Sequence, residues 1–341
     1  MPKAWFPSLS ANDRQYALRV AAPRSGRRPH LLEKDIWVVQ ALSVLFSAPF
    51  ANDLVFKGGT SLSKAYDIIR RFSEDIDITY DIRALAPDFA ADSEEPLPPT
   101  RSQEKRWTRV IRARLAEWTR EYALPAVQEG LARSRCAADV RADADRIYIG
   151  YTPLFDGYGF VKPEVKLEFG ARSTGEPRKR RPVVCDASLH LPDLAFPAAS
   201  PSVMLAERTF WEKATAMHVF CKRERGRGER LSRHWHDLVR LDDGGYAATA
   251  LADRKLARAV ARHKSVFFRE RDAGGGWIDY RAAVTGGLQL VPAGAARGVL
   301  ADDYGRMLDD GMLLGDEETF EGIMGRCADI EARANSYEGN A

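Results

Sequence analysis

The sequence has 341 residues, of which 45% are hydrophobic and 29% charged, and its 51 Lys and Arg against 48 Asp and Glu give a formal net charge of +3. This composition is typical of a globular protein and excludes a chain that is disordered throughout. The small net charge excludes a strongly basic field over the whole protein, so any surface for nucleic acid must be a local patch.

The cysteines and the apolar segments indicate a compartment for the protein. The four cysteines are scattered, without the spacing of a disulfide framework or a zinc site. No uninterrupted apolar run reaches the roughly 18 residues of a membrane span, and residues 1–28 lack the apolar core of a signal peptide. We therefore expect a cytoplasmic protein without membrane contact.

The hydrophobic pattern predicts an α+β protein. Residues 1–28 resemble a polar, basic N-terminal arm, and the proline- and acid-rich stretch 84–104 a surface insertion. Apolar residues at helical spacing predict helices over 30–47, 61–70, 103–122, 203–221 and 230–242. Short apolar or alternating runs predict strands at 54–56, 75–80, 146–151 and 161–169.

These elements predict two domains after the N-terminal arm. Strands dominate the first half of the chain and helices the second. We therefore expect a catalytic domain over 29–200, built on a mixed β-sheet flanked by helices. A mainly helical C-terminal domain over 201–341 follows.

The strand at 75–80 carries an acidic pair. Asp75 and Asp77 alternate with isoleucines, so they leave the same face of the strand about 6.6 Å apart. Two carboxylates at that distance repel by about 2–3 kcal/mol at an effective dielectric near 20. A divalent cation such as Mg²⁺ or Mn²⁺ would relieve this repulsion, although a solvated strand face has the same pattern.

A glycine-rich turn precedes the acidic strand. The segment 57–61, consisting of Lys57, Gly58, Gly59, Thr60 and Ser61, joins a predicted strand to a predicted helix, with Thr60 in position to cap it. Glycines let the backbone approach a ligand, and a helix N-terminus offers free amides and a positive dipole end for phosphate. A plain capped turn has a similar sequence, but its combination with the acidic strand predicts a triphosphate site beside a metal site.

A third carboxylate is a candidate for the same site. Lys166 and Glu168 share one face of an alternating strand, opposite Val165, Leu167 and Phe169. Glu168 joins Asp75 and Asp77 as a metal ligand if this strand pairs beside theirs. The pattern fits an exposed strand equally well.

Three segments resemble the AbiEii/AbiGii group of nucleotidyltransferase toxins, within the polymerase-β-like nucleotidyltransferases. They are Leu32 to Trp37, Phe56 to Lys64 and Arg71 to Asp77. The resemblance continues through Lys166 and Glu168, then 207–217 and 230–241. It is absent or unclear for 1–28, 84–145 and most of 245–341.

The resemblance implies an activity and partners. The expected enzyme is a Mg²⁺-dependent toxin of an abortive-infection or toxin–antitoxin system acting in phage defence. It would transfer a nucleotide from a nucleoside triphosphate to RNA, expected at the 3′ end of tRNA, release pyrophosphate and block translation. A cognate antitoxin, often a winged-helix protein, would be its partner.

The resemblance also implies roles for residues outside the acidic strand. Ser73 would contribute to the nucleotide site, Lys213 would lie against the triphosphate, and Asp237 would be the acidic residue of the last motif. Trp235 and His236 stand where the family often has Arg and Asp. Together with Asp75 and Asp77, Lys213 and Asp237 form the expected catalytic set. The sequence pattern alone also allows other roles for these two residues. Lys213 could be a lysine whose side chain extends from an apolar stripe to solvent, and Asp237 could be a solvated carboxylate on a helix.

Two basic stretches are candidates for RNA contact. Residues 172–181 carry five positive charges against one negative, and residues 222–233 six against two. Neutralising RNA phosphates would make binding there sensitive to salt, although most charge runs are solvated loops. The residues assigned to RNA are Arg178, Lys179, Arg180, Arg181, Arg223 and Arg225.

Other functions remain open from the sequence. A glycosyltransferase or phosphohydrolase could use the acidic pair with the same metal, although the glycine turn ahead of the strand favours nucleotidyl transfer. The acceptor could be a protein or a small molecule. A non-catalytic relative that binds RNA or nucleotide is the remaining alternative.

Overall fold

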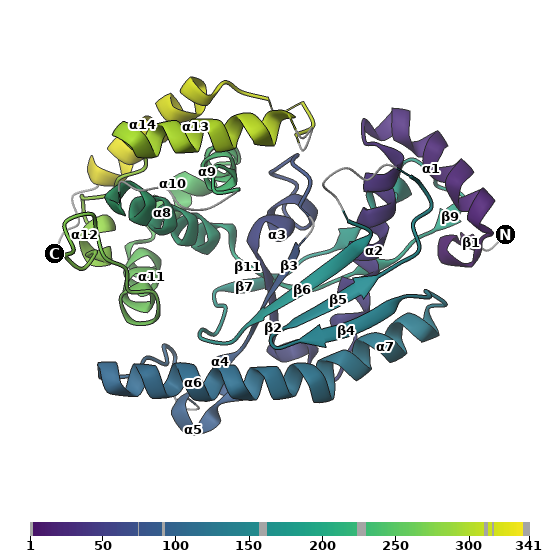
Figure 1. Cartoon of the computed structure of the whole chain (residues 1–341), viewed down its shortest axis with the longest axis horizontal. Helices are drawn as coiled ribbons and strands as arrows, with labels where there is room; N and C mark the ends of the chain where they lie inside the picture. The colour runs from purple at the N-terminus through teal and green to yellow at the C-terminus, as the bar shows by residue number, and fades with distance from the viewer. Residues whose placement is uncertain are drawn as a thin grey trace. The chain divides into compact units, whose positions relative to one another are not determined.

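The computed structural model describes residues 3–73, 75–90, 93–156, 162–223, 230–309, 313–315 and 317–336 (Figure 1). The chain divides into two compact units. The first, called the sheet unit here, comprises Met1–Ala65, Phe72–Pro96 and Thr108–Met204. The second, the helical unit, comprises Tyr66–Arg71, Leu97–Trp107 and Leu205–Ala341.

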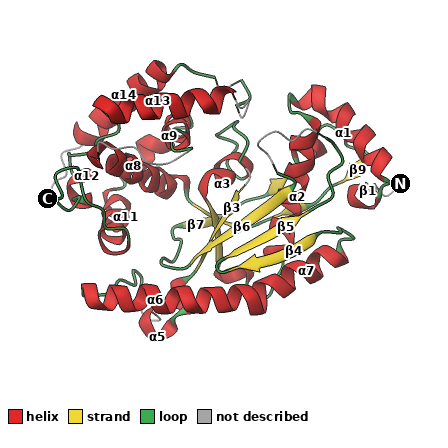
Figure 2. Ribbon diagram, in the orientation of Figure 1, coloured by secondary structure: helices red, strands yellow, loops and turns green. Residues whose placement is uncertain are grey.

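The sheet unit is built on a seven-stranded mixed sheet with the strand order β4-β5-β6-β3-β2-β11-β7, drawn in yellow in Figure 2. β3 runs parallel to β6 and β11 parallel to β2, and the other neighbours are antiparallel. The strands are β2 (Leu54–Lys57), β3 (Asp75–Tyr80), β4 (Asp139–Asp143), β5 (Arg146–Gly150), β6 (Glu164–Gly170), β7 (Arg178–Arg180) and β11 (Ser202–Met204).

Strict alternation gives the sheet one apolar and one polar face. In β6, Val165 and Leu167 are fully buried, whereas Lys166 and Glu168 on the opposite face are half-buried. α2 (Pro29–Leu45) packs against β6 and against α7 (Leu124–Arg133), which also packs against β4. The polar face therefore carries the acidic strand residues.

The N-terminal residues contribute to this unit. Within the stretch whose composition suggested a polar arm, residues Ala11–Ser25 form α1, and its Leu18 and Ala21 are fully buried. β1 (Ala4–Trp5) pairs in parallel with β9 (Leu194–Ala195), and the ring of Phe6 stacks on Phe196 at 4.9 Å. A narrow stripe of alanines and one leucine among arginines is enough for a packed helix but leaves little sign in the composition.

A long helical run follows the acidic strand. α6 (Arg101–Trp118) continues through a π-helical turn, η3 (Thr119–Ala123), into α7. Pro125, which has no amide hydrogen to donate, lies near the start of α7 just after this turn. Sequence periodicity predicted a helix over 103–122 but not its continuation as α7. The remaining short elements of the sheet unit are η1 (Phe6–Ser8), η2 (Ala51–Asp53), α3 (Gly58–Lys64), α4 (Ile82–Leu85), α5 (Pro87–Ala90), β8 (Val183–Val184), η4 (Asp186–Leu189) and β10 (Ala198–Ala199).

The helical unit consists mainly of seven described helices. They are α8 (Ala206–Arg223), α9 (Arg233–Asp243), α10 (Tyr246–Ala252), α11 (Arg254–Phe267), α12 (Tyr280–Ala283), α13 (Gly294–Asp309) and α14 (Phe320–Ser336). Its core contains Trp211, Trp235 and Tyr304, each at most 1% exposed. The predicted mixed sheet flanked by helices and the mainly helical C-terminal region are confirmed.

Among the described residues, none of the helices combines the length and apolar character needed to cross a lipid bilayer.

Candidate functional site

The acidic pair lies at the start of β3, on the polar face of the sheet. Asp75 and Asp77 are both half-buried. In the parallel register with β6, Asp77 stands across from Glu168 and Asp75 across from Lys166. The structure therefore brings the three predicted metal ligands to neighbouring positions on two strands.

A lysine side chain lies between two of these carboxylates. The Nζ atom of Lys166 is 3.2 Å from Oδ1 of Asp75 and 3.2 Å from Oε1 of Glu168. The Nε atom of Arg146 lies 3.0 Å from the same oxygen of Glu168. Partial burial works against the charged form of Lys166, but the two carboxylates outweigh it and raise the pKa of Lys166. Lys166 thus balances part of the negative charge that the acidic pair concentrates.

The three carboxylates do not form a preassembled metal centre. Within the described ranges, no group of three or more His, Cys, Asp and Glu side chains has the arrangement of a metal site. The chemistry of Asp75, Asp77 and Glu168 nevertheless fits Mg²⁺ or Mn²⁺, because both are hard ions that prefer oxygen ligands. A cation bound between Asp75 and Glu168 would have to displace the ammonium group of Lys166.

The glycine turn lies directly against the acidic pair. Gly58 has a φ of +78°, and a Cβ atom there would lie 2.1 Å from Oδ2 of Asp77. Any side chain at position 58 would therefore displace the Asp77 carboxylate. The sequence identified the glycine pair but not this contact.

Thr60 joins the turn to the acidic strand. Its Oγ1 donates a hydrogen bond to the backbone oxygen of Asp75 and lies 2.9 Å from Oγ of Ser73. Thr60 lies inside α3 and the N-cap residue is Lys57, so the expected capping role of Thr60 is wrong. The hydroxyl instead fixes the start of β3, which carries Asp75.

A buried ion network anchors the other end of α3. The Nζ atom of Lys64 lies 2.6 Å from Oδ1 of Asp35 in α2 and 2.5 Å from Oδ1 of Asp186 in η4. The other oxygen of Asp35 accepts a 2.7 Å hydrogen bond from the backbone amide of Asp186. No role was expected for these residues, although Asp35 and Lys64 lie in segments that resemble the family. The network holds the helix that begins at Gly58.

The helical unit contains a second cluster, formed by Lys213 and Asp237 with an unpredicted partner, Arg71. Arg71 donates to both oxygens of Asp237 at 2.6 and 2.8 Å, and Nζ of Lys213 lies 2.9 Å from Oδ2. Asp237 is fully buried, so it is not the solvated carboxylate that its pattern also allowed. Burial alone would raise the pKa of Asp237, but Arg71 and Lys213 hold it well below the ordinary value.

This cluster brings two cations together. Two cations share the single carboxylate of Asp237, and Nδ1 of His234 lies 3.4 Å from Nζ of Lys213. Burial, and then the charge of Lys213, lower the pKa of His234 to about 3, so this histidine is neutral at pH 7. Two buried cations close together are chemically suited to a phosphate group.

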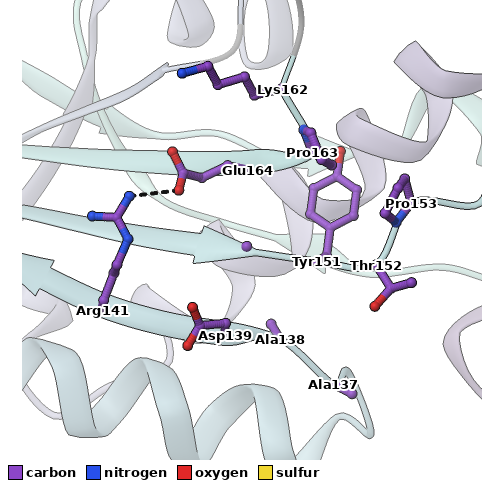
Figure 3. Close-up of a pocket in the computed structure, with 11 residues that line it drawn as sticks. Ala137, Ala138, Asp139, Arg141, Tyr151, Thr152, Pro153, Lys162, Pro163 and Glu164 are labelled. Atoms are coloured by element: carbon purple, nitrogen blue, oxygen red, sulfur yellow. Dashed lines mark hydrogen bonds and ion pairs between the residues drawn. The ribbon is translucent and has the colours of Figure 1, made fainter. Parts of the chain in front are cut away.

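An open pocket of about 990 Å³ lies at the start of β6, the strand that carries Lys166 and Glu168 (Figure 3). An ion pair of 2.9 Å joins Arg141 to Glu164, and Glu164 shares its strand face with Lys166. The ring of Tyr151 stacks on Trp37 at 4.8 Å. This pocket was not predicted from the sequence. It is lined by Ala137, Ala138, Asp139, Arg141, Gly150, Tyr151, Thr152, Pro153, Lys162, Pro163 and Glu164.

The residues expected to contact RNA belong to different units of the chain. Arg178 to Arg180 form β7, the edge strand of the sheet, and Arg180 donates to Oδ1 of Asn52 at 3.1 Å. Arg181 follows this strand. Positive charge on an edge strand also discourages pairing with another chain. Arg223 ends α8 and lies 3.2 Å from Glu270, and Arg225 lies outside the described residues.

Comparisons with known proteins give one family. The family model described as "Nucleotidyl transferase AbiEii toxin, Type IV TA system" matches residues 40–326. The structure of MenT4, a nucleotidyltransferase toxin from Mycobacterium tuberculosis H37Rv, is similar at a TM-score of 0.40 and 17% identity, over 97% of this chain and 100% of that one. No curated protein sequence matches this one.

Proposed function

The chain belongs to the AbiEii family of nucleotidyltransferase toxins of type IV toxin–antitoxin systems, and from this premise we propose that it transfers a nucleoside monophosphate from a nucleoside triphosphate to RNA. The family membership confirms the resemblance drawn from the sequence motifs. The triphosphate, the metal, the RNA acceptor and the roles of individual residues are the parts that we propose.

The contact between Gly58 and Asp77 carries the proposal. Phosphates bound along the backbone of Gly58 to Ser61 would lie beside the two carboxylates, because no side chain separates the turn from Asp77. Thr60 and Ser73 keep the turn and the strand in that register. This is the arrangement that positioning of a triphosphate requires.

Asp75 and Asp77 would hold the divalent ion, with Glu168 as the third carboxylate. When bound, the ion would neutralise phosphate charge and stabilise the charge that develops on the transferring and leaving groups. Lys166 would leave its place between Asp75 and Glu168 and turn toward the phosphates. The proposed role of Lys213 is to neutralise the leaving pyrophosphate. Asp237 and Arg71 would hold the side chain of Lys213 in position.

The proposed reaction forms one bond and breaks another at the α-phosphorus. A hydroxyl of the RNA attacks this phosphorus, and the bond to the β-phosphate oxygen breaks to release pyrophosphate. Glu168 accepts the proton of the attacking hydroxyl. We propose the 3′ end of tRNA as the acceptor. The toxic effect would be a block of translation in the cytoplasm, used in phage defence, and the partner would be a winged-helix antitoxin.

The test is transfer of labelled nucleotide. The purified protein would be incubated with each α-³²P-labelled triphosphate, total RNA and Mg²⁺ or Mn²⁺, and labelled RNA and released pyrophosphate would be measured. We expect RNA labelling with one or more triphosphates, and its loss in Asp75→Ala and Asp77→Ala. Asp143→Ala is the matched control, since Asp143 is an exposed aspartate in the same cross-strand row as Asp77.

Three outcomes would contradict the proposal. Label on protein or on a small molecule, with none on RNA, would show that RNA is not the acceptor. Release of free phosphate or a nucleoside diphosphate, in place of pyrophosphate, would show that the reaction is not nucleotidyl transfer. An Asp75→Ala variant that still labels RNA at the rate of the unmodified protein would remove the proposed site.

A further inference from the structure

A short β-hairpin connects α11 to α12 in the helical unit. The amide of Asp272 donates to the oxygen of Gly276 at 2.9 Å, and the amide of Ile278 to the oxygen of Glu270 at 3.0 Å. Between them, Arg271 and Trp277 stand opposite each other as an antiparallel bridge. The turn of this hairpin is formed by Ala273, Gly274 and Gly275, with Gly275 at a φ of +84°.

One face of the hairpin presents an indole ring with two guanidinium groups. Arg269 and Arg271 are two residues apart on one strand, so their side chains leave the same face. Their Cζ atoms lie 4.3 and 4.2 Å from the ring centroid of Trp277. The indole is nevertheless 49% exposed, the highest value for any tryptophan among the described residues.

The alternate residues fix the hairpin to the rest of the helical unit. Ile278 is buried, and Glu270 lies 3.2 Å from Arg223 at the end of α8. The amide of Ala273 donates to the oxygen of Lys222 at 3.0 Å. Because this side is anchored, the face with Trp277 is held toward solvent.

The charge on the exposed face is not balanced locally. Among the described residues, no carboxylate lies within ion-pair distance of Arg269 or Arg271, and Arg271 donates only to the backbone oxygen of Gly275. The two acids next to these arginines in the sequence have other partners: Glu270 lies 3.2 Å from Arg223, and Asp272 accepts from the amide of Gly276 at 2.8 Å. An Arg over an exposed aromatic ring is worth only about 0.5–1 kcal/mol, so folding gains little from this arrangement.

The chemistry of the face fits a nucleic-acid strand. Guanidinium groups bind phosphate through paired hydrogen bonds, and an exposed indole stacks on a base of any sequence. A protein partner usually needs about 800 Å² on each side, and the other large exposed hydrophobic side chain of the hairpin is Phe268 alone, 37% exposed. Single-stranded RNA offers phosphate and unstacked bases together.

We propose that the face formed by Arg269, Arg271 and Trp277 is a binding surface for a single-stranded segment of RNA, holding the RNA through stacking on the indole and phosphate contacts to the two guanidinium groups. The proposal rests on RNA being the acceptor and adds a binding surface outside the nucleotidyl-transfer site. It assigns a different set of residues from the basic stretches that the sequence singled out.

The experiment measures RNA binding without catalysis. A fluorescein-labelled single-stranded RNA of about 12 nucleotides and unfractionated tRNA would be titrated with the full-length protein, without triphosphate, at two salt concentrations. We expect Trp277→Ala to weaken binding roughly tenfold and Trp277→Phe to restore most of it, because the phenyl ring still stacks. Arg269→Gln/Arg271→Gln should weaken binding at low salt and reduce the salt slope by about two.

The matched control is Arg109→Gln/Arg112→Gln, which removes the same charge from two exposed residues of α6. This control should bind RNA like the unmodified protein. Equal RNA affinity in Trp277→Ala, in the double hairpin variant and in the unmodified protein would overturn the proposal. So would equal losses in the hairpin and control variants, or binding to phosphatidylserine vesicles without binding to RNA.

The outcome is separate from that of the proposed function. Loss of RNA binding in the hairpin variants, with no nucleotide transferred to any RNA, would support the surface and contradict the transfer. The reverse outcome is nucleotide transfer to RNA that is abolished in Asp75→Ala, together with RNA binding that is unchanged in the hairpin variants. It would support the transfer and contradict the surface.

Discussion

Arg71 donates through Nε and Nη2 to the two carboxylate oxygens of Asp237, at 2.6 and 2.8 Å, and both side chains are buried. Lys213 contacts the same carboxylate, so two cations share this acid. In the chain, Arg71 precedes the proposed site residue Ser73 by two positions. An acid expected to act in the chemistry therefore first serves to balance buried positive charge.

The first prediction concerns the stability of this cluster. Asp237→Asn removes the charge of the carboxylate that Arg71 and Lys213 both contact, and breaking a buried ion pair on one side costs about 3–5 kcal/mol. We expect urea denaturation to show a loss of that order in the free energy of unfolding. Asp242→Asn on the same helix breaks an exposed pair with Arg333 and should cost less than about 1 kcal/mol. Similar small losses in both variants would mean that the buried cluster does not support the fold.

The second prediction concerns Gly58. In Gly58→Ala, the new Cβ would meet Oδ2 of Asp77 at 2.1 Å, so the carboxylate must move and we expect nucleotide transfer to be lost. Gly245 has the same φ of +78° but nothing within 4 Å of an added Cβ, so Gly245→Ala isolates the backbone effect. Both variants should lose about 1–2 kcal/mol of stability in urea denaturation. Transfer retained in Gly58→Ala would show that the contact with Asp77 is dispensable.

Much of the fold could be predicted because its elements are periodic. The alternation in β3, β5 and β6 reflects strands with one buried face. The apolar spacing in α2 and α8 marks two helices that are buried over most of their surface. α1 was not recognised because its buried stripe consists mostly of alanine, which composition does not distinguish from a solvated helix. β4 was not recognised either, because its residues are only half-buried or exposed.

The site was predictable only where its residues are close in the sequence. The glycine turn and the acidic pair are seventeen residues apart, counted from Gly58 to Asp75, and local pattern was enough to associate them. Arg71 and Asp237 are 166 residues apart, and Lys64 and Asp186 are 122 residues apart. Such pairs cannot be predicted from a single sequence, because nothing in the local pattern indicates which distant acid pairs with which base.

The third prediction concerns the lysine between the carboxylates. Lys166→Met removes a positive charge 3.2 Å from Asp75 and Glu168, so a divalent cation should bind more tightly, by about tenfold. Isothermal titration with MnCl₂, without nucleotide, measures this directly. Lys162→Met is the control, since Lys162 is an exposed lysine of the same surface whose ammonium group contacts no carboxylate among the described residues. Unchanged or weaker Mn²⁺ binding in Lys166→Met would show that Lys166 does not compete for this position.

The last prediction concerns the pH dependence of stability through His218. This side chain is 2% exposed, and its Nδ1 accepts a 3.0 Å hydrogen bond from the amide of Gln289. Burial, and then the charge of Lys222, lower the pKa of His218 to about 4. In the unfolded chain the pKa is about 6.5, so the unfolded state binds the proton first as the pH falls.

The sign of the effect follows from this difference. The stability that neutral His218 contributes is present above about pH 6.5 and is lost as the pH falls toward about 4, by about 3 kcal/mol over the whole window. His218→Asn keeps an acceptor but does not titrate, so its unfolding free energy should fall by about 2 kcal/mol less than that of the unmodified protein between about pH 7 and 5. Urea denaturation at each pH measures the difference, with His190→Asn, at a part-exposed histidine, as the control. Parallel pH profiles for His218→Asn and the unmodified protein would show that His218 is not held neutral by its burial.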